Sequence, residues 1–290
     1  MVKKAVIPAA GFGTRFLPAT KSQPKEMLPI VDTPTIQYVV QEAIDAGITD
    51  ILLIIGRGKR TLEEYFSKNY ELEDQLREKK KQAELDLINF MPDNVAVHFI
   101  WQHEQNGLGD AVRYARHHVG DEPFAVLLGD TVLESFTDKP VIGHLIDVYD
   151  RFEEGVFALE EVAPELVSRY GVIDGEDLGD RIYRIGDMVE KPAVEEAPSN
   201  LVVASRYVLP PEIFTALDVV PPGKGGEIQL TDALRLIMKD QPMYGYKVDG
   251  IRHDMGNKLE FLKTNIHYGL KHKDLAEGLK EYLKELVKSF

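Results

Sequence analysis

Apolar residues near the start of the chain alternate between short continuous runs and a run with helical spacing. Residues 3–8 and 50–56 are continuous apolar runs bounded by turn residues, which is typical of buried strands. Residues 34–46, between them, place their apolar side chains on one helical face. The pattern therefore predicts a strand, a helix and a parallel strand.

The same order repeats further along the chain. Residues 95–101 and 124–128 have the character of strands, and residues 107–118 between them have helical spacing. Repeated units of this kind build parallel sheets with helices on both faces. We therefore expect an α/β fold, Rossmann-like, with a mixed, mostly parallel twisted sheet flanked by helices.

The second half of the chain is richer in strands. Residues 156–162, 170–174, 182–190 and 201–209 all have strand character, with turn signals between them. We interpret this part as an α+β section laid against the first sheet.

Two further segments have helical character. Residues 61–90 are rich in Glu, Lys, Leu and Gln, which predicts two exposed helices without a chemical role. Residues 257–272 and 273–290 carry amphipathic spacing that suits packing either on the chain itself or on a second subunit. We expect one domain over 1–290, with a nucleotide-binding half at 1–155, a sugar-binding half at 156–256 and a helical tail at 257–290.

Composition narrows the classes of partner. The 290 residues are 44% hydrophobic without a membrane-spanning run, and the apolar start is too short for the core of a signal peptide, so we expect a cytoplasmic protein. The net charge of −14 opposes binding to nucleic acid and to anionic membranes. The chain has no cysteine, which excludes disulfides and thiolate metal sites. An anionic ligand therefore needs a local basic pocket.

The segment after the first predicted strand has the features of such a pocket. Ala9-Ala10-Gly11-Phe12-Gly13-Thr14-Arg15 combines small residues with a cation, and Pro24-Lys25-Glu26 adds a second cation. Ligands bind at the carboxyl ends of strands in open parallel sheets, and small residues let the backbone approach phosphates. The segment matches neither the dinucleotide nor the phosphate-loop signature. By itself it is equally compatible with a glycine-rich turn that carries two surface cations.

Several ordered motifs resemble those of the sugar nucleotidyltransferases over nearly the whole chain. The motifs are PAAGFGTRFLPATKSQPKEMLPI at 8–30, Gln102 with Gly107-Leu108-Gly109, Leu128-Gly129-Asp130, Tyr170-Gly171-Val172, Val189-Glu190-Lys191-Pro192, EIQLTDA at 227–233 and HDMGNKL at 253–259. The resemblance implies the glycosyltransferase-A-like type of α/β fold. It also implies nucleotide transfer to a sugar 1-phosphate.

The resemblance assigns roles to individual residues. Arg15 and Lys25 would hold the triphosphate, and Gln102 and Gly107 would recognise the pyrimidine. The residues expected along the rest of the nucleotide are Ala9, Ala10, Gly11, Gly13 and Thr14.

A metal site and an acceptor site follow from the same resemblance. Asp130 would bind Mg²⁺, an ion that prefers oxygen ligands, and Asp254 would be a second carboxylate ligand. Glu190 would bind the hexose, Lys191 its phosphate, and Gly171 would leave room for the sugar ring. Alone, an Asp at either position would by default cap a helix or turn, and Glu190-Lys191-Pro192 would be more typical of a surface charge pair before a turn.

The implied reaction joins UTP to glucose 1-phosphate and yields UDP-glucose and pyrophosphate, in a homo-oligomer (dimer or tetramer). Catalysis would depend on Arg15, Lys25, Asp130 and Lys191 around a common cavity. Thymidylyl- or adenylyl-transferring relatives, a nucleotide-binding oxidoreductase and a non-catalytic nucleotide-sugar sensor are the alternatives. EIQLTDA and HDMGNKL favour uridylyl transfer.

Two further points concern the sugar side and the histidines. Ser205 stands where family members often have glycine, close to the expected sugar pocket, which bears on the identity of the hexose. We interpret His98, His103, His117 and His118 as surface or locally hydrogen-bonded residues rather than metal ligands.

Overall fold

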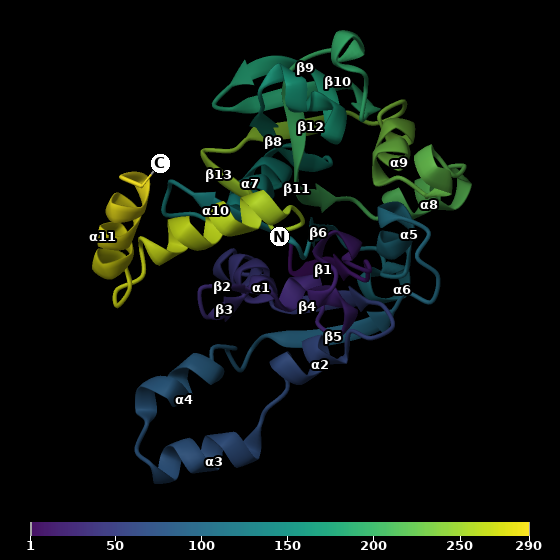
Figure 1. Cartoon of the computed structure of the whole chain (residues 1–290). Coiled ribbons are helices and arrows are strands. Elements are labelled where there is room, and N and C mark those ends of the chain that lie inside the picture. The colour runs from purple at the N-terminus through teal and green to yellow at the C-terminus, as the bar shows by residue number, and fades with distance from the viewer. Residues whose placement is uncertain (1, 290) are drawn as a thin grey trace.

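The computed structural model describes residues 2–289 and has a nine-stranded sheet at its centre (Figure 1). The strands are β1 (Lys4–Ala9), β4 (Asp50–Ile55), β5 (Ala96–Trp101), β6 (Phe124–Leu127), β8 (Val156–Glu161), β9 (Gly171–Gly179), β10 (Ile182–Glu190), β11 (Leu201–Leu209) and β12 (Met243–Lys247). Their order across the sheet is β5-β4-β1-β6-β11-β8-β12-β10-β9. The α/β fold class is confirmed.

The first part of the sheet is parallel, as the repeated strand–helix–strand pattern predicts. β1 pairs in parallel with β4 and with β6, and β4 pairs in parallel with β5. Apolar residues such as Val6 and Leu52 are register partners and are fully buried. Burial on both faces explains why β1 and β4 are continuous apolar runs rather than alternating ones.

The second half of the chain extends this sheet instead of lying against it, so the expectation of a separate packed section is wrong. β11 pairs antiparallel with β6, with Tyr207 opposite Val126. Nearly every residue of β11 is buried, since helices cover both faces of the sheet there. Antiparallel pairing dominates beyond this junction, and β12 with β8 is a further parallel pair.

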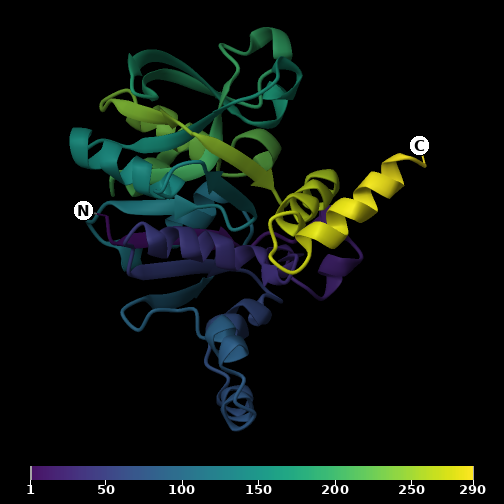
Figure 2. The ribbon, with the colours of Figure 1, turned by 90° about the vertical axis from the view of Figure 1, so that its left-hand side faces the viewer.

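Helices pack on both faces of the sheet (Figure 2). One core contains apolar residues of α1 (Thr35–Asp45) and α7 (Val141–Phe152). The opposite core contains residues of α5, α6, α8 and α9. The bounds of these helices are α5 (Leu108–Arg113), α6 (Arg116–Val119), α8 (Ile213–Val219) and α9 (Leu230–Ile237). The helix predicted at 107–118 is thus broken in two.

Residues 60–88 form three helices where two were expected. These are α2 (Arg60–Phe66), α3 (Tyr70–Glu78) and α4 (Gln82–Ile88), and α3 and α4 form an arm that projects from the body (Figure 1). Asn69 caps α3 by accepting a hydrogen bond from the Leu72 N–H at 3.1 Å. Lys80 has a φ of 55°, which ends α3 before α4 begins. These local breaks divide the predicted helices.

Smaller elements complete the fold. They are β2 (Pro29–Ile30), β3 (Thr33–Pro34), β7 (Thr131–Ser135) and β13 (Gly250–Asp254), with 3₁₀ turns η1 (Thr14–Phe16), η2 (Ala19–Lys21), η3 (Lys25–Met27), η4 (Pro164–Arg169), η5 (Val194–Glu196) and η6 (Lys224–Gly226). β2 pairs with β3, and β7 pairs antiparallel with β13. The second pair continues directly from the end of β6.

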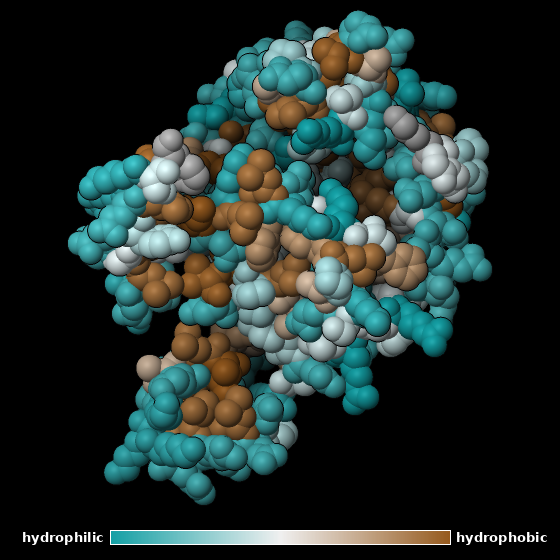
Figure 3. All heavy atoms as spheres, in the orientation of Figure 1, coloured by the Kyte–Doolittle hydropathy of each residue, from teal (hydrophilic) through white to brown (hydrophobic). Residues whose placement is uncertain are grey.

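The tail forms α10 (Lys258–Gly269) and α11 (Ala276–Val287), close to the predicted ranges. α10 packs on β13 and β2, whereas α11 has no buried residue (Figure 2). Apolar side chains lie exposed on both helices, including Leu262 and Tyr282, and brown atoms gather there and on the arm in Figure 3. Within residues 2–289, no helix is both long and apolar enough to cross a membrane.

Candidate active site

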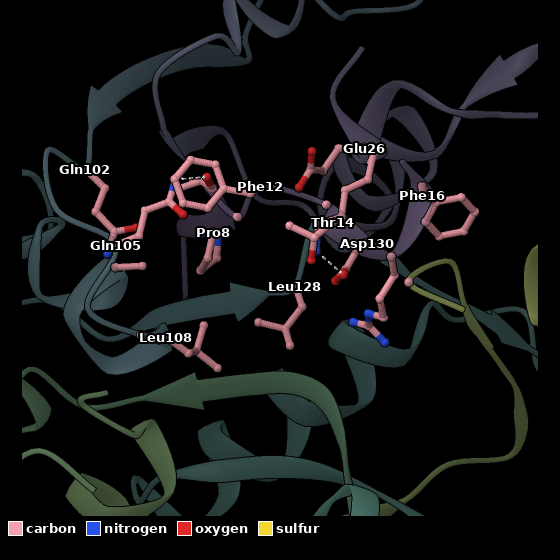
Figure 4. Close-up of a pocket in the computed structure, with 18 of the residues that line it drawn as sticks. Pro8, Phe12, Thr14, Phe16, Glu26, Gln102, Gln105, Leu108, Leu128 and Asp130 are labelled. Carbon is pink, nitrogen blue, oxygen red and sulfur yellow. Dashed lines mark hydrogen bonds and ion pairs between the residues drawn. The ribbon is translucent and has the colours of Figure 1, made fainter. Parts of the chain in front are cut away.

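A cavity of about 560 Å³ lies beyond the carboxyl ends of β1 and β6 (Figure 4). Its lining includes the predicted residues Ala10, Gly11, Gly13, Thr14, Arg15, Lys25, Gln102, Gly107 and Asp130. Phe12, Glu26, Gln105, Glu227 and Gly256 also contribute to the lining. The position agrees with the rule that places ligands at the strand ends of open α/β sheets.

The loop after β1 is held by hydrogen bonds to its backbone. Gly13 has a φ of 67°, a conformation that favours glycine, and its carbonyl accepts a hydrogen bond from Thr20 Oγ1 at 2.7 Å. The Gln105 side-chain amide donates to the Ala10 carbonyl at 2.7 Å (Figure 4). Phe12 lines the cavity and is exposed there. These hydrogen bonds define the path of the loop at the cavity.

Lys25 and Asp130 form an ion pair inside the cavity (Figure 4). Burial opposes the charge of Lys25, but the carboxylates of Asp130 and Glu26 outweigh it and raise the pKa of Lys25. Burial also opposes the charge of Asp130, but Lys25 and Arg15 lower the pKa of Asp130. Both groups are therefore charged at neutral pH.

A second, more deeply buried pair lies behind Lys25. Lys59 Nζ is 2.6 Å from Glu26 Oε2, and their side chains are 6% and 1% exposed. Burial raises the pKa of Glu26 although Lys59 and Lys25 oppose that shift, and burial lowers the pKa of Lys59. Since Glu26 follows Lys25 in η3, this pair anchors the turn that presents Lys25. No role for Lys59 was predicted from the sequence.

Asp254 lies at the edge of the cavity rather than in its lining. It ends β13 as the register partner of Thr131, and the Met255 N–H donates to the Asp130 carbonyl at 3.0 Å. A Cβ on Gly256 would lie 2.9 Å from Arg15 Nη2 and 3.0 Å from Asp254 Oδ1. The structure therefore brings Asp254 close to Arg15 and to the segment that carries Asp130.

The predicted acceptor residues gather in a separate cluster. Lys191 Nζ is 2.9 Å from Glu190 Oε1, and Thr231 Oγ1 donates to Glu190 Oε2 at 2.7 Å. A Cβ on Gly171 would lie 3.3 Å from the same Glu190 oxygen, so any larger residue would crowd this carboxylate. Lys191 has a φ of 47°, an uncommon conformation for a residue with a side chain. Thr231 was not predicted to contribute.

The common cavity that we expected holds three of its four catalytic candidates. Arg15, Lys25 and Asp130 line it, whereas Lys191 does not belong to the lining formed by the described residues. The 227–233 segment connects the two places, because Glu227 lines the cavity and Thr231 contacts Glu190. The acceptor cluster of Glu190, Lys191 and Thr231 is thus connected to the cavity by one segment but does not belong to its lining.

Three more predicted positions have particular surroundings. Ala9 packs in the core at 1% exposure, because side chains alternate between the faces of β1, so it does not line the cavity as expected. The Gln102 amide donates to Asp110 Oδ2 at 2.9 Å while lining the cavity. Gly107 has a φ of 104°, and a Cβ there would lie 2.8 Å from the Ile228 carbonyl oxygen, so the close approach requires glycine.

Ser205 is buried in β11 with a φ of 62°, a conformation usually taken by glycine. Its carbonyl accepts a hydrogen bond from the Leu128 N–H at 3.2 Å. The family's glycine at this position is thus accounted for by backbone geometry. This hydrogen bond connects Ser205 with the strand junction beside Leu128.

Comparisons with known proteins agree with this geometry. Residues 4–269 match the model of the nucleotidyl transferase family. The UTP–glucose-1-phosphate uridylyltransferase YngB of Bacillus subtilis (strain 168) is 49% identical over 99% of this chain and 96% of its own. A UTP-bound UGPase from Acinetobacter baumannii has a TM-score of 0.92 at 41% identity, covering 99% of this chain and 100% of that one. A UDP-glucose pyrophosphorylase complexed with UDP-glucose has a TM-score of 0.87 at 43% identity, covering 94% and 100%.

Proposed function

The chain belongs to the nucleotidyl transferase family, and from that premise we propose that it transfers the uridylyl group of UTP to glucose 1-phosphate. The products are UDP-glucose and pyrophosphate. The observation that carries this proposal is a cavity with Arg15, Lys25 and Asp130 that is joined by one segment to the Glu190–Lys191 cluster. Relatives with UTP or UDP-glucose bound share the fold at more than 40% identity.

The chemistry follows from the charges in the cavity. A phosphate oxygen of glucose 1-phosphate attacks the α-phosphorus of UTP, the bond to the β-phosphate oxygen breaks, and pyrophosphate leaves with that electron pair. The attacking phosphate is already an anion, so no side chain has to remove a proton from it. Lys25 and Arg15 offset the negative charge around the α-phosphorus, which is the main task of a protein in such transfers.

The acceptor cluster orients the second substrate. Glu190 accepts hydrogen bonds from sugar hydroxyls, and Lys191 pairs with the phosphate of glucose 1-phosphate. Thr231 holds the Glu190 carboxylate in place. Gln102 and Gly107, which also line the cavity, bind the pyrimidine of UTP. The cavity and the acceptor cluster are joined by the 227–233 segment, and two fixed binding sites favour an in-line arrangement of the reacting atoms.

The proposal includes Mg²⁺ held by Asp130 and Asp254. The donor set fits, because both groups are carboxylates and Mg²⁺ prefers oxygen ligands. Asp254 is the register partner of Thr131, the residue that follows Asp130. When bound, the ion supplies charge neutralisation between carboxylate and substrate phosphates. Lys25, now paired with Asp130, lies within reach of the same phosphates.

A homo-oligomer in the cytoplasm also belongs to the proposal. Its support is the exposed apolar side of α10 and α11, with Leu262, Ile266 and Tyr282 each at least 41% exposed. Apolar patches of this kind mark protein interfaces more often than they remain open to solvent.

The test is release of pyrophosphate from purified protein given Mg²⁺, glucose 1-phosphate and each nucleoside triphosphate in turn. We expect turnover with UTP alone or with UTP strongly preferred. Turnover with the thymidine or adenosine triphosphate instead would assign the chain to the corresponding alternative. Binding of UTP without any pyrophosphate release would identify a sensor and refute the enzyme.

A further inference from the structure

Three side chains that the proposed reaction does not use converge where β7, β13 and α10 meet. His267 Nε2 is 2.8 Å and His253 Nε2 is 3.7 Å from Glu134 Oε2. The two imidazole rings lie 5.1 Å apart, and the three possible ligand atoms all lie within 4.8 Å of one another. Zinc bonds to His and Glu are about 2.0–2.2 Å long, so the ligands of one tetrahedral ion lie roughly 3.4 Å apart. The observed spacing therefore suits a single ion.

His253 supplies an independent observation. Its side chain is buried, and its Nε2 atom has no hydrogen-bond partner within residues 2–289. A buried polar atom left unpaired is costly and calls for an explanation. The other ring nitrogen, Nδ1, lies 3.2 Å from Thr264 Oγ1, which is also buried. In metal sites the ring nitrogen that does not bind the ion is usually held by a hydrogen bond, and Thr264 is placed to hold Nδ1 of His253 in this way.

We propose that Glu134, His253 and His267 bind a divalent transition metal ion, with Zn²⁺ as the representative. Two imidazoles and one carboxylate suit such ions, whereas Mg²⁺ prefers oxygen ligands. The ion is bound by Nε2 of His253, which otherwise lacks a partner among the described residues, and by Oε2 of Glu134. This site is separate from the Asp130–Asp254 pair and does not depend on the proposed reaction.

One neighbouring charge works against the ion. Lys271 Nζ contacts Glu134 Oε1, the oxygen that the ion leaves unused. The Lys271 side chain is 51% exposed, so it can turn into solvent when the ion binds. Repulsion between its ammonium group and a dication weakens binding without preventing it.

The location gives the ion a structural consequence. It would link α10 to the β7–β13 pair, and this pair directly follows Asp130 and ends at Asp254. Metal bound there stabilises the segment that carries both carboxylates. We expect the ion to raise the thermal stability of the whole chain, because it binds only the folded state.

The experiment is zinc titration by calorimetry on full-length protein stripped of metal and then kept in excess Mg²⁺. We expect one tight Zn²⁺ site in the wild type, weakened at least about tenfold in His267→Ala, which loses a ligand. His98→Ala is the matched control, because His98 belongs to the other His–carboxylate group, with Asp50 and His118. Loss of binding in His98→Ala but not in His267→Ala would overturn the proposal.

Lys271→Met is a second test, because it removes the competing ammonium group at an exposed position and leaves all three ligands in place. Without the competing ammonium, zinc affinity is expected to rise several-fold. The visible absorption of bound Co²⁺ should change in His267→Ala and stay unchanged in His98→Ala. Absence of zinc binding in the wild type, or equal affinity in the wild type and His267→Ala, would contradict the site.

Discussion

Two lysine–carboxylate pairs, one proposed for each substrate, have different surroundings. Lys25 and Asp130 lie in the cavity with side chains 17% and 20% exposed, and the buried pair of Glu26 and Lys59 supports them from behind. Lys191, the cation of the acceptor cluster, is 42% exposed, and its carboxylate is supported by one hydroxyl. The nucleotide side is thus built into the core, whereas the acceptor side lies at the surface.

The difference indicates how each side is expected to respond to substitution. Changes on the nucleotide side affect both folding and turnover, because burial makes an unpaired charge costly. Changes on the acceptor side affect binding of the sugar phosphate and leave stability nearly intact, because water can replace a lost partner. Four substitutions test this contrast.

The largest effect is expected from Lys59→Met, which leaves Glu26 buried without its cation. Breaking a buried pair costs about 3–5 kcal/mol, so the free energy of unfolding should fall by that amount at neutral pH. Burial already raises the pKa of Glu26. A group with a raised folded-state pKa contributes stability at low pH and loses it as the pH rises, so the deficit should shrink in acid. Urea unfolding at neutral and acidic pH measures this.

Lys59→Met combined with Glu26→Gln is the control for that experiment. The double variant has no buried charge at this place, so it should recover most of the lost stability. If Lys59→Met were as stable as the wild type at neutral pH, the pair would not support the nucleotide side.

The next effect concerns Lys25→Met. Removing a preorganised cation that stabilises transition-state charge lowers kcat by about 10²–10³-fold. Steady-state pyrophosphate release measures the loss, and circular dichroism confirms that the variant is folded. Lys21→Met changes an exposed lysine near the same loop and should keep normal turnover. Similar kcat values for the two variants would remove Lys25 from the mechanism.

A smaller effect is expected from Lys191→Met. Loss of a hydrogen bond to a charged group costs about 1.5–3 kcal/mol, so KM for glucose 1-phosphate should rise roughly 10- to 150-fold. KM for UTP and the melting temperature should change little, because Lys191 lies at the surface. Arg184→Met is the control, because Arg184 is an exposed cation on β10, the strand that ends just before Lys191. An equal rise in the KM values for glucose 1-phosphate and UTP would show that Lys191 does not act on the acceptor side alone.

The smallest effect is expected from Thr231→Val, which removes the hydroxyl bonded to Glu190. A neutral hydrogen bond contributes about 0.5–1.5 kcal/mol, so KM for glucose 1-phosphate should rise roughly 2- to 12-fold. Thr231→Ser keeps the hydroxyl and should behave like the wild type. Identical kinetics of the valine and serine variants would mean that this hydroxyl does not position Glu190.

The nucleotide loop could be predicted because its information is local. The small residues Ala10, Gly11 and Gly13 directly follow a strand, and that order alone places them at the ligand edge of the sheet. Gln105, after β5, contacts this loop at Ala10, and Lys59, after β4, contacts Glu26 in η3. Their proximity depends on the parallel pairing of β4 with β1 and of β5 with β4, which no short motif reveals.

The sheet itself was predicted only as far as neighbouring elements determine it. Strand–helix–strand repeats predict parallel pairing near β1, but the junction between β6 and β11 joins strands about 80 residues apart and cannot be read from periodicity. The cluster of Glu134, His253 and His267 could not be predicted for the same reason. His253 and His267 look like isolated residues along the chain, and only the pairing of β7 with β13 brings Glu134 to them.

The pairing of Thr131 with Asp254 has a consequence for how the enzyme can vary. Asp254 belongs to this ladder and Asp130 immediately precedes it, so the separation of the two carboxyl groups is set by the strand register and not by loop length. Insertions between β7 and β13 can lengthen the intervening 114 residues without altering that separation. Deleting a single residue within either strand would shift the register and change the distance between the two carboxyl groups.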